Sequence, residues 1–535
     1  MTKSRSSSVY PRGERVLPAA ALAAVFLCLV AGAASAQTIG GTVSDETGGV
    51  LPGVTVEARS PALIEQVRTA VTDGNGQYRI VALEPGAYSV TFSLAGFSTL
   101  VREGIELETG FNANVDAEMA VGQLAETITV TEASPVIDVQ SIEQSAAIDR
   151  DIYESLPTAR QYDNLALLIP AMNIAGGSTT SLSADTAGIS GEGRNRMSIH
   201  GSQPNDAEVH FDGMDISSPS FDGAPHFTPF DTGIAEFVYD YSGNSAEVET
   251  GGVRLNMIPK EGSNQFSGSL RLDGTHSAWL ANNVDDELLG RGITGGRDGG
   301  TALDQAWTIA PAIGGPIAED RLWFFATYSF RRGSIYPANN FANTDTSSLA
   351  YVPDVDRHMF TRKDISEGSL RLTWQATSKD KVQVYGSLPG NRRHILPALS
   401  GADLDPLYIA PEAGSENEAW VNTYQLTWVR PQTNRILFEF GVGMQPVSNR
   451  WPDLSTEVQR MRGTGREDIN ARPDLPGVFE ATTSTMSRNM GFIFQGTEFH
   501  ISTTNTNVRG SMSFVTGSHN RKLGTQINQK FELFA

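Results

Sequence analysis

Residues 369–376 have the sequence SLRLTWQA, and apolar and polar side chains alternate along the whole stretch. One face carries the apolar residues Leu370, Leu372, Trp374 and Ala376, and the other carries Ser369, Arg371, Thr373 and Gln375. The same alternation recurs in RLWFFATYSF (321–330), KVQVYGSL (381–388), TYQLTWVR (423–430) and RILFEFGV (435–442). A period of two indicates β-strands that present different faces to different surroundings.

Two architectures share this alternation. A transmembrane barrel strand turns its apolar side chains toward lipid and its polar side chains toward the lumen. A strand of a soluble antiparallel sandwich also alternates, with its apolar side chains toward a core. The strands alone therefore leave both architectures open, and the rest of the chain has to distinguish them.

The first 36 residues predict export from the cytoplasm. Lys3, Arg5, Arg12 and Arg15 precede an apolar run over 18–34, and Ala-Ser-Ala follows at 34–36, which is the pattern of a cleaved secretory signal peptide. The apolar run is shorter than the roughly 20 residues of a spanning helix. Cys28, the only cysteine, lies in this leader, so we expect no disulfide and no cysteine-ligated zinc.

Composition restricts the possible partners. The formal net charge of −21 makes nucleic acid an unsuitable partner, because a polyanion binds basic surfaces. The 53 glycines and 19% charged residues favour strands and turns over long amphipathic helices.

Residues 37–122 contain short alternating segments separated by turn sequences, which predicts a β-sandwich. Tyr78, Tyr88 and Phe92 fall at core positions of these strands. The acidic turns DETG (45–48) and DGNG (73–76) lack the full spacing of a calcium-binding EF-hand loop, so we interpret them as turn chemistry. The stretches at 40–58, 72–80 and 83–97 resemble the carboxypeptidase regulatory-like domain of transthyretin-like fold. That resemblance implies no peptidase activity.

Residues 123–260 predict a mixed α+β domain. ESLPTARQYDNLALLIPAM (154–172) indicates a short helix ending near Pro170. The segments 194–216 and 234–270 resemble the plug domain of TonB-dependent outer-membrane receptors, and the sandwich in front makes the match closest to the Oar-like branch. The plug motif comprises Arg196, Ile199, His200, Gly201, Asp212, Gly213, Gly251, Gly252, Asn256 and Lys260, and all of these match the family except His200. The match continues through Gly262, Asn264, Phe266 and Gly268. At His200 the family usually has arginine.

The segment ETITVT separates the first two regions. By itself this β-branched stretch is better explained as a domain linker. The resemblance implies that it is the TonB box, made of Glu126, Thr127, Ile128, Thr129, Val130 and Thr131, which would add a strand to a periplasmic energy transducer.

Residues 261–535 are expected to form strands of a transmembrane barrel, because the signal peptide and the plug resemblance decide between the two architectures. We count about ten to twelve strand candidates, whereas plugged transporters close with about 22. The fold class expected is therefore mainly β: a transthyretin-like β-sandwich (37–122), a mixed α+β plug with the TonB box (123–260) and an incomplete antiparallel transmembrane β-barrel (261–535). We expect the sequence to be an N-terminal fragment with the barrel unfinished.

The resemblance implies uptake of an extracellular ligand, driven by the inner-membrane proton gradient. The implied partners are a TonB-type energy transducer complex, outer-membrane lipid, the barrel assembly machinery and an unidentified ligand, with the N-terminal domain in the periplasm of a cell bounded by an outer membrane. An alternative is a surface adhesin without transport. A secreted hydrolase finds no support, because no catalytic motif accompanies the histidines or acidic pairs; we expect no enzyme activity, no cofactor and no metal. The region from Gly213 to Phe230, which contains SPSFDGAPHFTPF (218–230), is a candidate apical loop for ligand contact. Packing of this aromatic and Pro-rich loop against the barrel wall explains the sequence equally well.

Overall fold

A computed structural model describes residues 37–534 with internal gaps, and the following sections concern these residues only. The gaps are 61–62, 64–66, 84–85, 108–111, 123–126, 131–143, 157–159, 177–194, 218–230, 244–247, 249, 281–285, 288–301, 337–340, 346, 397–407, 410–414, 434–435, 452–477, 481, 483–484, 488–498 and 517–518. The predicted signal peptide and the loop 218–230 lie outside the described residues.

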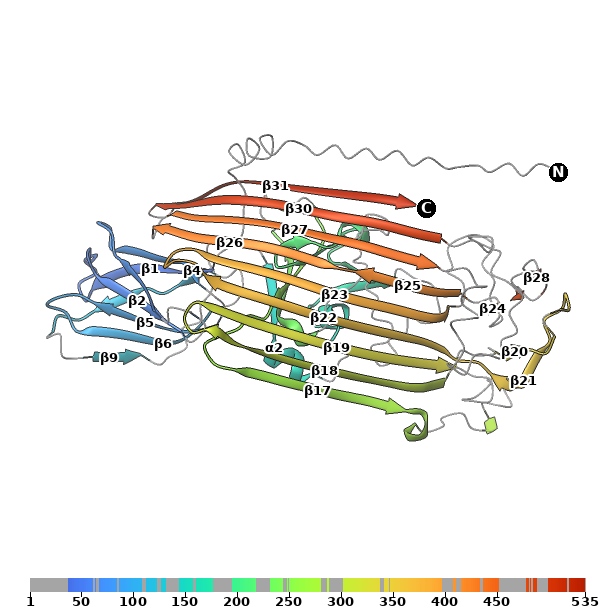
Figure 1. The fold of residues 1–535 in the computed structure, drawn as a ribbon. Coiled ribbons are helices and arrows are strands. Elements are labelled where there is room, and N and C mark those ends of the chain that lie inside the picture. The colour runs from blue at the N-terminus through green and yellow to red at the C-terminus, as the bar shows by residue number, and fades with distance from the viewer. Residues whose placement is uncertain are drawn as a thin grey trace, which may run out of the picture.

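Two sheets form the N-terminal unit, which we call the sandwich (Figure 1). The first contains β4 (Gln77–Leu83), β1 (Gln37–Asp45), β7 (Asn112–Asn114) and β8 (Ala117–Met119). The second has the order β3 (Val67–Val71), β2 (Thr55–Arg59), β5 (Gly86–Ser93), β6 (Thr99–Leu107) and β9 (Thr127–Val130). Tyr78, Tyr88 and Phe92 are buried in the core, as the sequence predicts.

The acidic turns of the sandwich also agree with their interpretation from sequence. The Asp45 carboxylate accepts hydrogen bonds from the backbone N–H groups of Thr47 and Gly49 at 2.9 and 2.8 Å. The Asp73 carboxylate accepts in the same way from Asn75 and Gln77 at 2.9 and 3.0 Å. Both carboxylates therefore stabilise their own turns.

The next unit, which we call the central unit, is a mixed sheet with two short helices. Its strand order is β10 (Gln144–Asp149), β15 (Ile234–Ser242), β16 (Arg254–Pro259), β13 (Glu208–Phe211) and β14 (Met214–Asp215). The other elements are α2 (Arg150–Ser155), α3 (Tyr162–Ala166), the hairpin β11 (Asn173–Gly176) and β12 (Asn195–Ser198), and the 3-10 turns η1 (Pro204–Asp206) and η2 (Asp231–Gly233). Helix α3 ends at Ala166, four residues before Pro170, and a turn continues to Met172.

The longest strands form one antiparallel sheet, which we call the long-strand sheet. In pairing order its members are β17 (Ser267–His276), β18 (Ala302–Ala318), β19 (Leu322–Tyr336), β22 (Thr361–Gln375), β23 (Lys381–Leu396), the consecutive pair β25 (Ser415–Val421) and β26 (Thr423–Thr433), then β27 (Ile436–Trp451), β30 (Phe499–Thr516) and β31 (His519–Phe534). The described strands place β17 and β31 at its two edges. The 3-10 turn η3 (Ser277–Trp279) follows β17.

Smaller pairings complete the description. Strands β20 (Phe341–Asn343) and β21 (Pro353–His358) form a hairpin, and β24 (Tyr408–Ile409), β29 (Thr485–Ser487) and β28 (Val478–Glu480) form a short sheet. Both lie at the end of the long strands opposite the sandwich (Figure 1). None of the helices described is long and apolar enough to cross a membrane.

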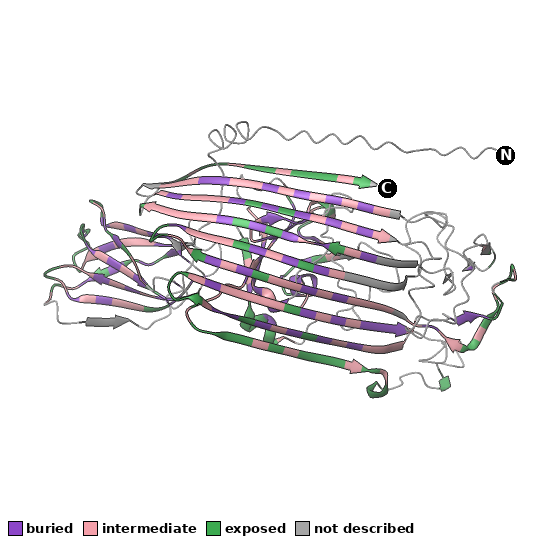
Figure 2. Ribbon diagram, in the orientation of Figure 1, coloured by how far each residue is buried: buried purple, intermediate pink, exposed green. Residues whose placement is uncertain are grey.

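The long-strand sheet is apolar on its outer face and polar on the face toward the central unit. On β22, Leu370 and Trp374 are 45% and 47% exposed, whereas Arg371 and Thr373 are 4% and 1% exposed. Figure 2 shows the alternation between exposed and buried residues along several of these strands. This polarity is the reverse of that in a soluble sandwich, and it is the arrangement of a lipid-facing barrel wall.

Candidate functional site

The tip of the central unit is a two-residue hairpin turn. Phe211 pairs with Met214 across β13 and β14, so Asp212 and Gly213 form the turn. Their φ angles are 48° and 73°, both in the left-handed region, which is why an Asp-Gly pair occurs here. The Gly213 N–H donates to the Asn256 side-chain oxygen at 2.8 Å. Three of the plug positions identified from sequence therefore build one rigid tip.

This tip docks into the polar face of the long-strand sheet. The Asp212 carbonyl accepts hydrogen bonds from Gln425 Nε2 at 3.1 Å and from an Arg509 terminal nitrogen at 2.9 Å. The Asp212 carboxylate lies 3.2 Å from the Arg371 guanidinium. A Cβ at Gly213 would overlap the guanidinium of Arg509. The close fit thus requires glycine for space as well as for its φ angle.

Strand β30 continues the contact along the next residues of the central unit. Asn507 Nδ2 donates to the Asp215 carbonyl at 3.1 Å, and Asn505 Nδ2 donates to the Ser217 carbonyl at 2.8 Å. Asn505, Asn507 and Arg509 are two residues apart, so they project from the same face of the strand. Lys530 of β31 also lies 2.7 Å from the Asp215 carboxylate. These side chains hold the backbone of the central unit in one register against the sheet.

A second contact lies where the central unit joins the sheet. The Glu261 carboxylate is 2.7 Å from Arg371 and 3.1 Å from Lys381, and it also accepts a hydrogen bond from Gln383. Burial alone would raise the pKa of Glu261, but the charges of Lys381 and Arg371 outweigh burial and lower it. Glu261 is therefore ionised at neutral pH, and Arg371 links it to Asp212.

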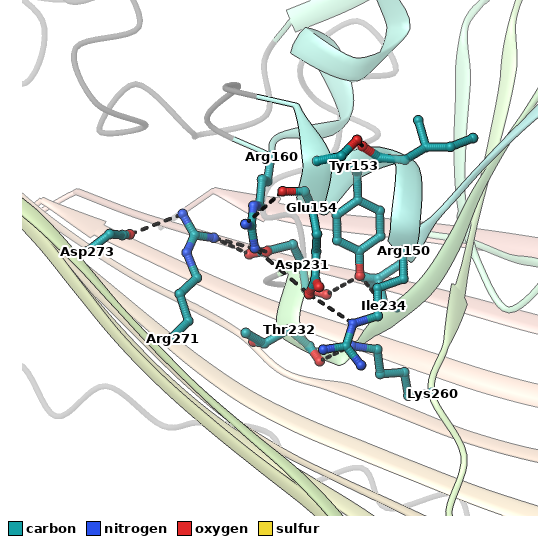
Figure 3. Close-up of polar contacts among 12 residues, drawn as sticks. Arg150, Tyr153, Glu154, Arg160, Asp231, Thr232, Ile234, Lys260, Arg271 and Asp273 are labelled. Atoms are coloured by element: carbon teal, nitrogen blue, oxygen red, sulfur yellow. Dashed lines mark hydrogen bonds and ion pairs between the residues drawn. The ribbon is translucent and has the colours of Figure 1, made fainter.

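A third contact centres on Asp231, whose side chain is 3% exposed. Arg271 of β17 donates to both Asp231 carboxylate oxygens at 2.9 Å, and Arg160 of the central unit lies 3.6 Å away (Figure 3). Arg150 pairs with Glu154 at 2.9 Å on the same side. One terminal nitrogen of Arg271 bonds both Asp231 oxygens, and its other terminal nitrogen lies 3.1 Å from the Asp273 carboxylate of the same strand, so Arg271 is held in place as it joins the two units.

Lys260 lies beside this cluster (Figure 3). Its ammonium donates to the Thr232 carbonyl at 3.1 Å. Burial, together with the nearby charge of Arg150, lowers the pKa of Lys260 to about 8.

The remaining predicted plug positions have structural roles away from the sheet. His200 and Gly201, with φ of 52° and 84°, form an exposed turn closed by a hydrogen bond from Ser202 N–H to Ile199 O at 2.9 Å. Arg196 donates to the Asn205 side-chain oxygen at 2.7 Å. The exposed position of His200 explains how histidine is accommodated where the family usually has arginine.

Gly251 and Gly252 differ in their surroundings. A Cβ at Gly252 would overlap the backbone of Asp206, whereas a Cβ at Gly251 would meet nothing within 4 Å. Gly252 therefore permits a close approach of two backbone segments, and no contact explains Gly251.

The motif after Lys260 anchors the first strands of the sheet. The Asn264 side-chain oxygen accepts from Asp320 N–H at 2.9 Å and from Trp323 Nε1 at 2.7 Å. The rings of Phe266 and Phe324 are 6.4 Å apart in an edge-on arrangement. These residues connect the end of the central unit to the β18–β19 turn.

The candidate TonB box has a partner that its sequence does not reveal. Thr127–Val130 form β9, which pairs in parallel with β6 of the sandwich. Glu126 and Thr131 lie outside the described residues.

Sequence reasoning did not single out the barrel-side contacts. These contacts come from four strands: Arg271 of β17, Arg371 of β22, Lys381 of β23, and Asn505, Asn507 and Arg509 of β30. Asp231 faces Arg271, and Glu261 faces Arg371 and Lys381. One sequence feature could have indicated these contacts: a long charged side chain on the polar face of a predicted strand, such as Arg371 within SLRLTWQA. When such a side chain is buried, it needs a partner of opposite charge.

Comparisons with known proteins agree with the two resemblances found in the sequence. Residues 38–120 match the family model of the carboxypeptidase regulatory-like domain. Over 408 residues, 71% of the chain, the sequence is 30% identical to the TonB-dependent transporter Oar of Myxococcus xanthus, and the match covers 35% of that protein. The chain thus spans about a third of the length of this curated relative.

Two solved structures are also similar. The outer membrane transporter YddB from Escherichia coli has 15% identity and a TM-score of 0.49, with 72% of this chain and 48% of that chain covered. The siderophore receptor PirA from Acinetobacter baumannii has 15% identity and a TM-score of 0.45, with 74% and 48% covered.

Proposed function

We propose, from the 30% identity that 71% of the chain shares with a TonB-dependent transporter, that this protein is a TonB-dependent outer-membrane receptor. It imports an extracellular ligand with energy from the inner-membrane proton gradient. In this proposal residues 37–122 form a periplasmic domain, residues 123–260 carry the TonB box and plug, and residues 261–535 form strands of the barrel. The central unit is the plug, and the long-strand sheet is part of the barrel wall.

The observation that carries the proposal is the polarity of the long-strand sheet. Its exposed face is apolar, as a lipid-facing surface requires. Its inner face binds the central unit through hydrogen bonds and ion pairs. Polar contacts of this kind suit a plug that has to move, because water can replace them when the plug shifts, whereas a large apolar interface would have no such substitute.

The mechanism follows from where these contacts lie. Arg371 bonds both Asp212 of the β13–β14 turn and Glu261, which follows the plug, and Arg271 bonds Asp231 in a separate contact. A pull on the chain before β10 would therefore act on a plug that is attached at several points. The force would have to break the ion pairs in sequence before a path opens. In the proposal, that pull comes from the energy transducer paired with residues 126–131.

Accumulation of labelled ligands in cells that make the protein tests this function. Oligosaccharides, peptides and metal chelates would be compared with and without a protonophore. We expect one class to accumulate only when the gradient is intact. We also expect Ile128→Pro to abolish uptake and leave ligand binding unchanged, since proline removes a backbone donor from the box. Binding without gradient-dependent accumulation would contradict transport and favour adhesion.

A further inference from the structure

The chain leaves the sandwich at the point where β6 begins. Ser98 N–H donates to Ala120 O at 2.9 Å, and Gly122 N–H donates to Gly96 O at 3.2 Å. Between these bonds, Phe97 and Val121 form an isolated antiparallel bridge. Residues 120–122 are therefore held against residues 96–98, the turn that leads into β6.

Strand β9 then runs beside β6 from its first residue. Thr99 is paired with Thr127, Leu100 with Ile128, Val101 with Thr129 and Arg102 with Val130. Only residues 123–126 separate this strand from the anchored Gly122. A tether of four residues gives β9 a high effective concentration at the β6 edge, so a short pairing can persist. Figure 1 shows β9 beside β6 at the margin of the sandwich.

Among the strands described, β9 is the last of its sheet, so only one of its two edges is paired. Successive backbone N–H and C=O groups of a strand point alternately to its two sides. Pairing with β6 uses one set, and the other set faces outward. A strand held in this way is already extended, which lowers the entropic cost of adding a further strand.

We propose that the β6 edge of the sandwich is a docking site for the candidate TonB box, and that the energy transducer adds its own strand to the outward edge of β9. This inference rests on the proposed function for the identity of the partner. The sandwich then holds the box in an extended conformation, and the transducer binds the box while β9 stays paired with β6.

A cysteine cross-link tests the docking in the full-length chain. Val101→Cys and Thr129→Cys stand at partnered positions, and the Cα separation of adjacent strands suits a disulfide. Val101 is only partly buried, whereas its neighbour Leu100 lies in the core, so the change spares the packing. Cys28 is replaced by alanine in all variants. The matched control combines Val101→Cys with Thr127→Cys, which is two residues out of register.

We expect the in-register pair to form its disulfide under mild oxidant at least fivefold faster than the control. Equal rates would overturn the docking. This readout requires neither ligand nor transducer, so it is independent of the proposed function.

Binding of the purified periplasmic domain of the transducer tests whether the transducer adds its strand to β9 while β9 remains paired with β6. We expect the oxidised in-register variant to bind with a Kd within twofold of its reduced form, or lower. A tenfold or greater loss on oxidation would overturn this arrangement and show that the sandwich competes with the transducer. Failure of the unmodified chain to bind the transducer at all would overturn the partner assignment together with the proposed function, while the cross-linking rates still decide the docking.

Discussion

Two separate constraints require glycine at position 213, one on backbone conformation and one on space. Its φ of 73° lies in the left-handed region, and the space where a Cβ would stand is filled by Arg509. Gly201 has a similar φ of 84° but nothing within 4 Å of that position. The two glycines therefore differ in packing and share the same conformational requirement, so a comparison separates backbone strain from docking.

We expect Gly201→Ala to cost about 1–2 kcal/mol of unfolding free energy, which is the strain of a left-handed non-glycine residue. Gly213→Ala should cost roughly 1–3 kcal/mol more, because Arg509 has to move away from the tip. Denaturant unfolding of the two purified variants measures the difference. Hydrogen exchange along β30 should also rise in Gly213→Ala alone. Equal losses in the two variants would contradict the docking role of Gly213.

At the scale of single strands, the sequence predicts much of what the structure contains. In TYQLTWVR, Gln425 and Thr427 are buried while Tyr424 and Leu426 are exposed, so local alternation identifies the two faces correctly. The tip turn is equally local, since Asp-Gly favours the left-handed angles it requires.

Contacts between distant strands are not encoded in this local way. Glu261 meets Arg371 across 110 residues of sequence, and that meeting depends on the register of several intervening strands. The pairing of β9 was also not predicted, because four β-branched residues carry no information about their partner. The anchored exit of the chain from the sandwich decides it.

The exposed apolar face of the long-strand sheet leads to a prediction about whether it contacts lipid or water. Leu370 is 45% exposed, so in a soluble protein Leu370→Arg would change stability by no more than about 0.5 kcal/mol. On a lipid-facing strand the same change should cost about 2–4 kcal/mol near the bilayer midplane. Leu349→Arg is the control, because Leu349 is 72% exposed and lies outside the long strands. Folding into lipid vesicles, followed by denaturant titration, distinguishes the two cases. A neutral effect of Leu370→Arg would argue against a membrane-facing wall.

At the scale of the whole molecule, the sandwich and the central unit have separate hydrophobic cores. The sandwich core extends from Ile39 to Met119, and the central core extends from Ile148 to Met257 and includes Tyr385 of β23. Among the residues that the structure describes, none belongs to both cores. The central unit therefore shares its core with the long-strand sheet, while the sandwich is linked to them by the segment that carries β9.

This division predicts two unfolding transitions in calorimetry of the full chain, because separate cores unfold as separate cooperative units. The first should coincide with the transition of an isolated fragment 37–131, which retains β9. A shorter fragment, 37–122, should be less stable than 37–131 by up to about 1 kcal/mol, since a strand of four residues at a sheet edge adds few contacts. A single transition for the full chain would mean that the sandwich is coupled to the plug, and a force applied to the box would then reach the plug through the sandwich as well as through the connecting chain.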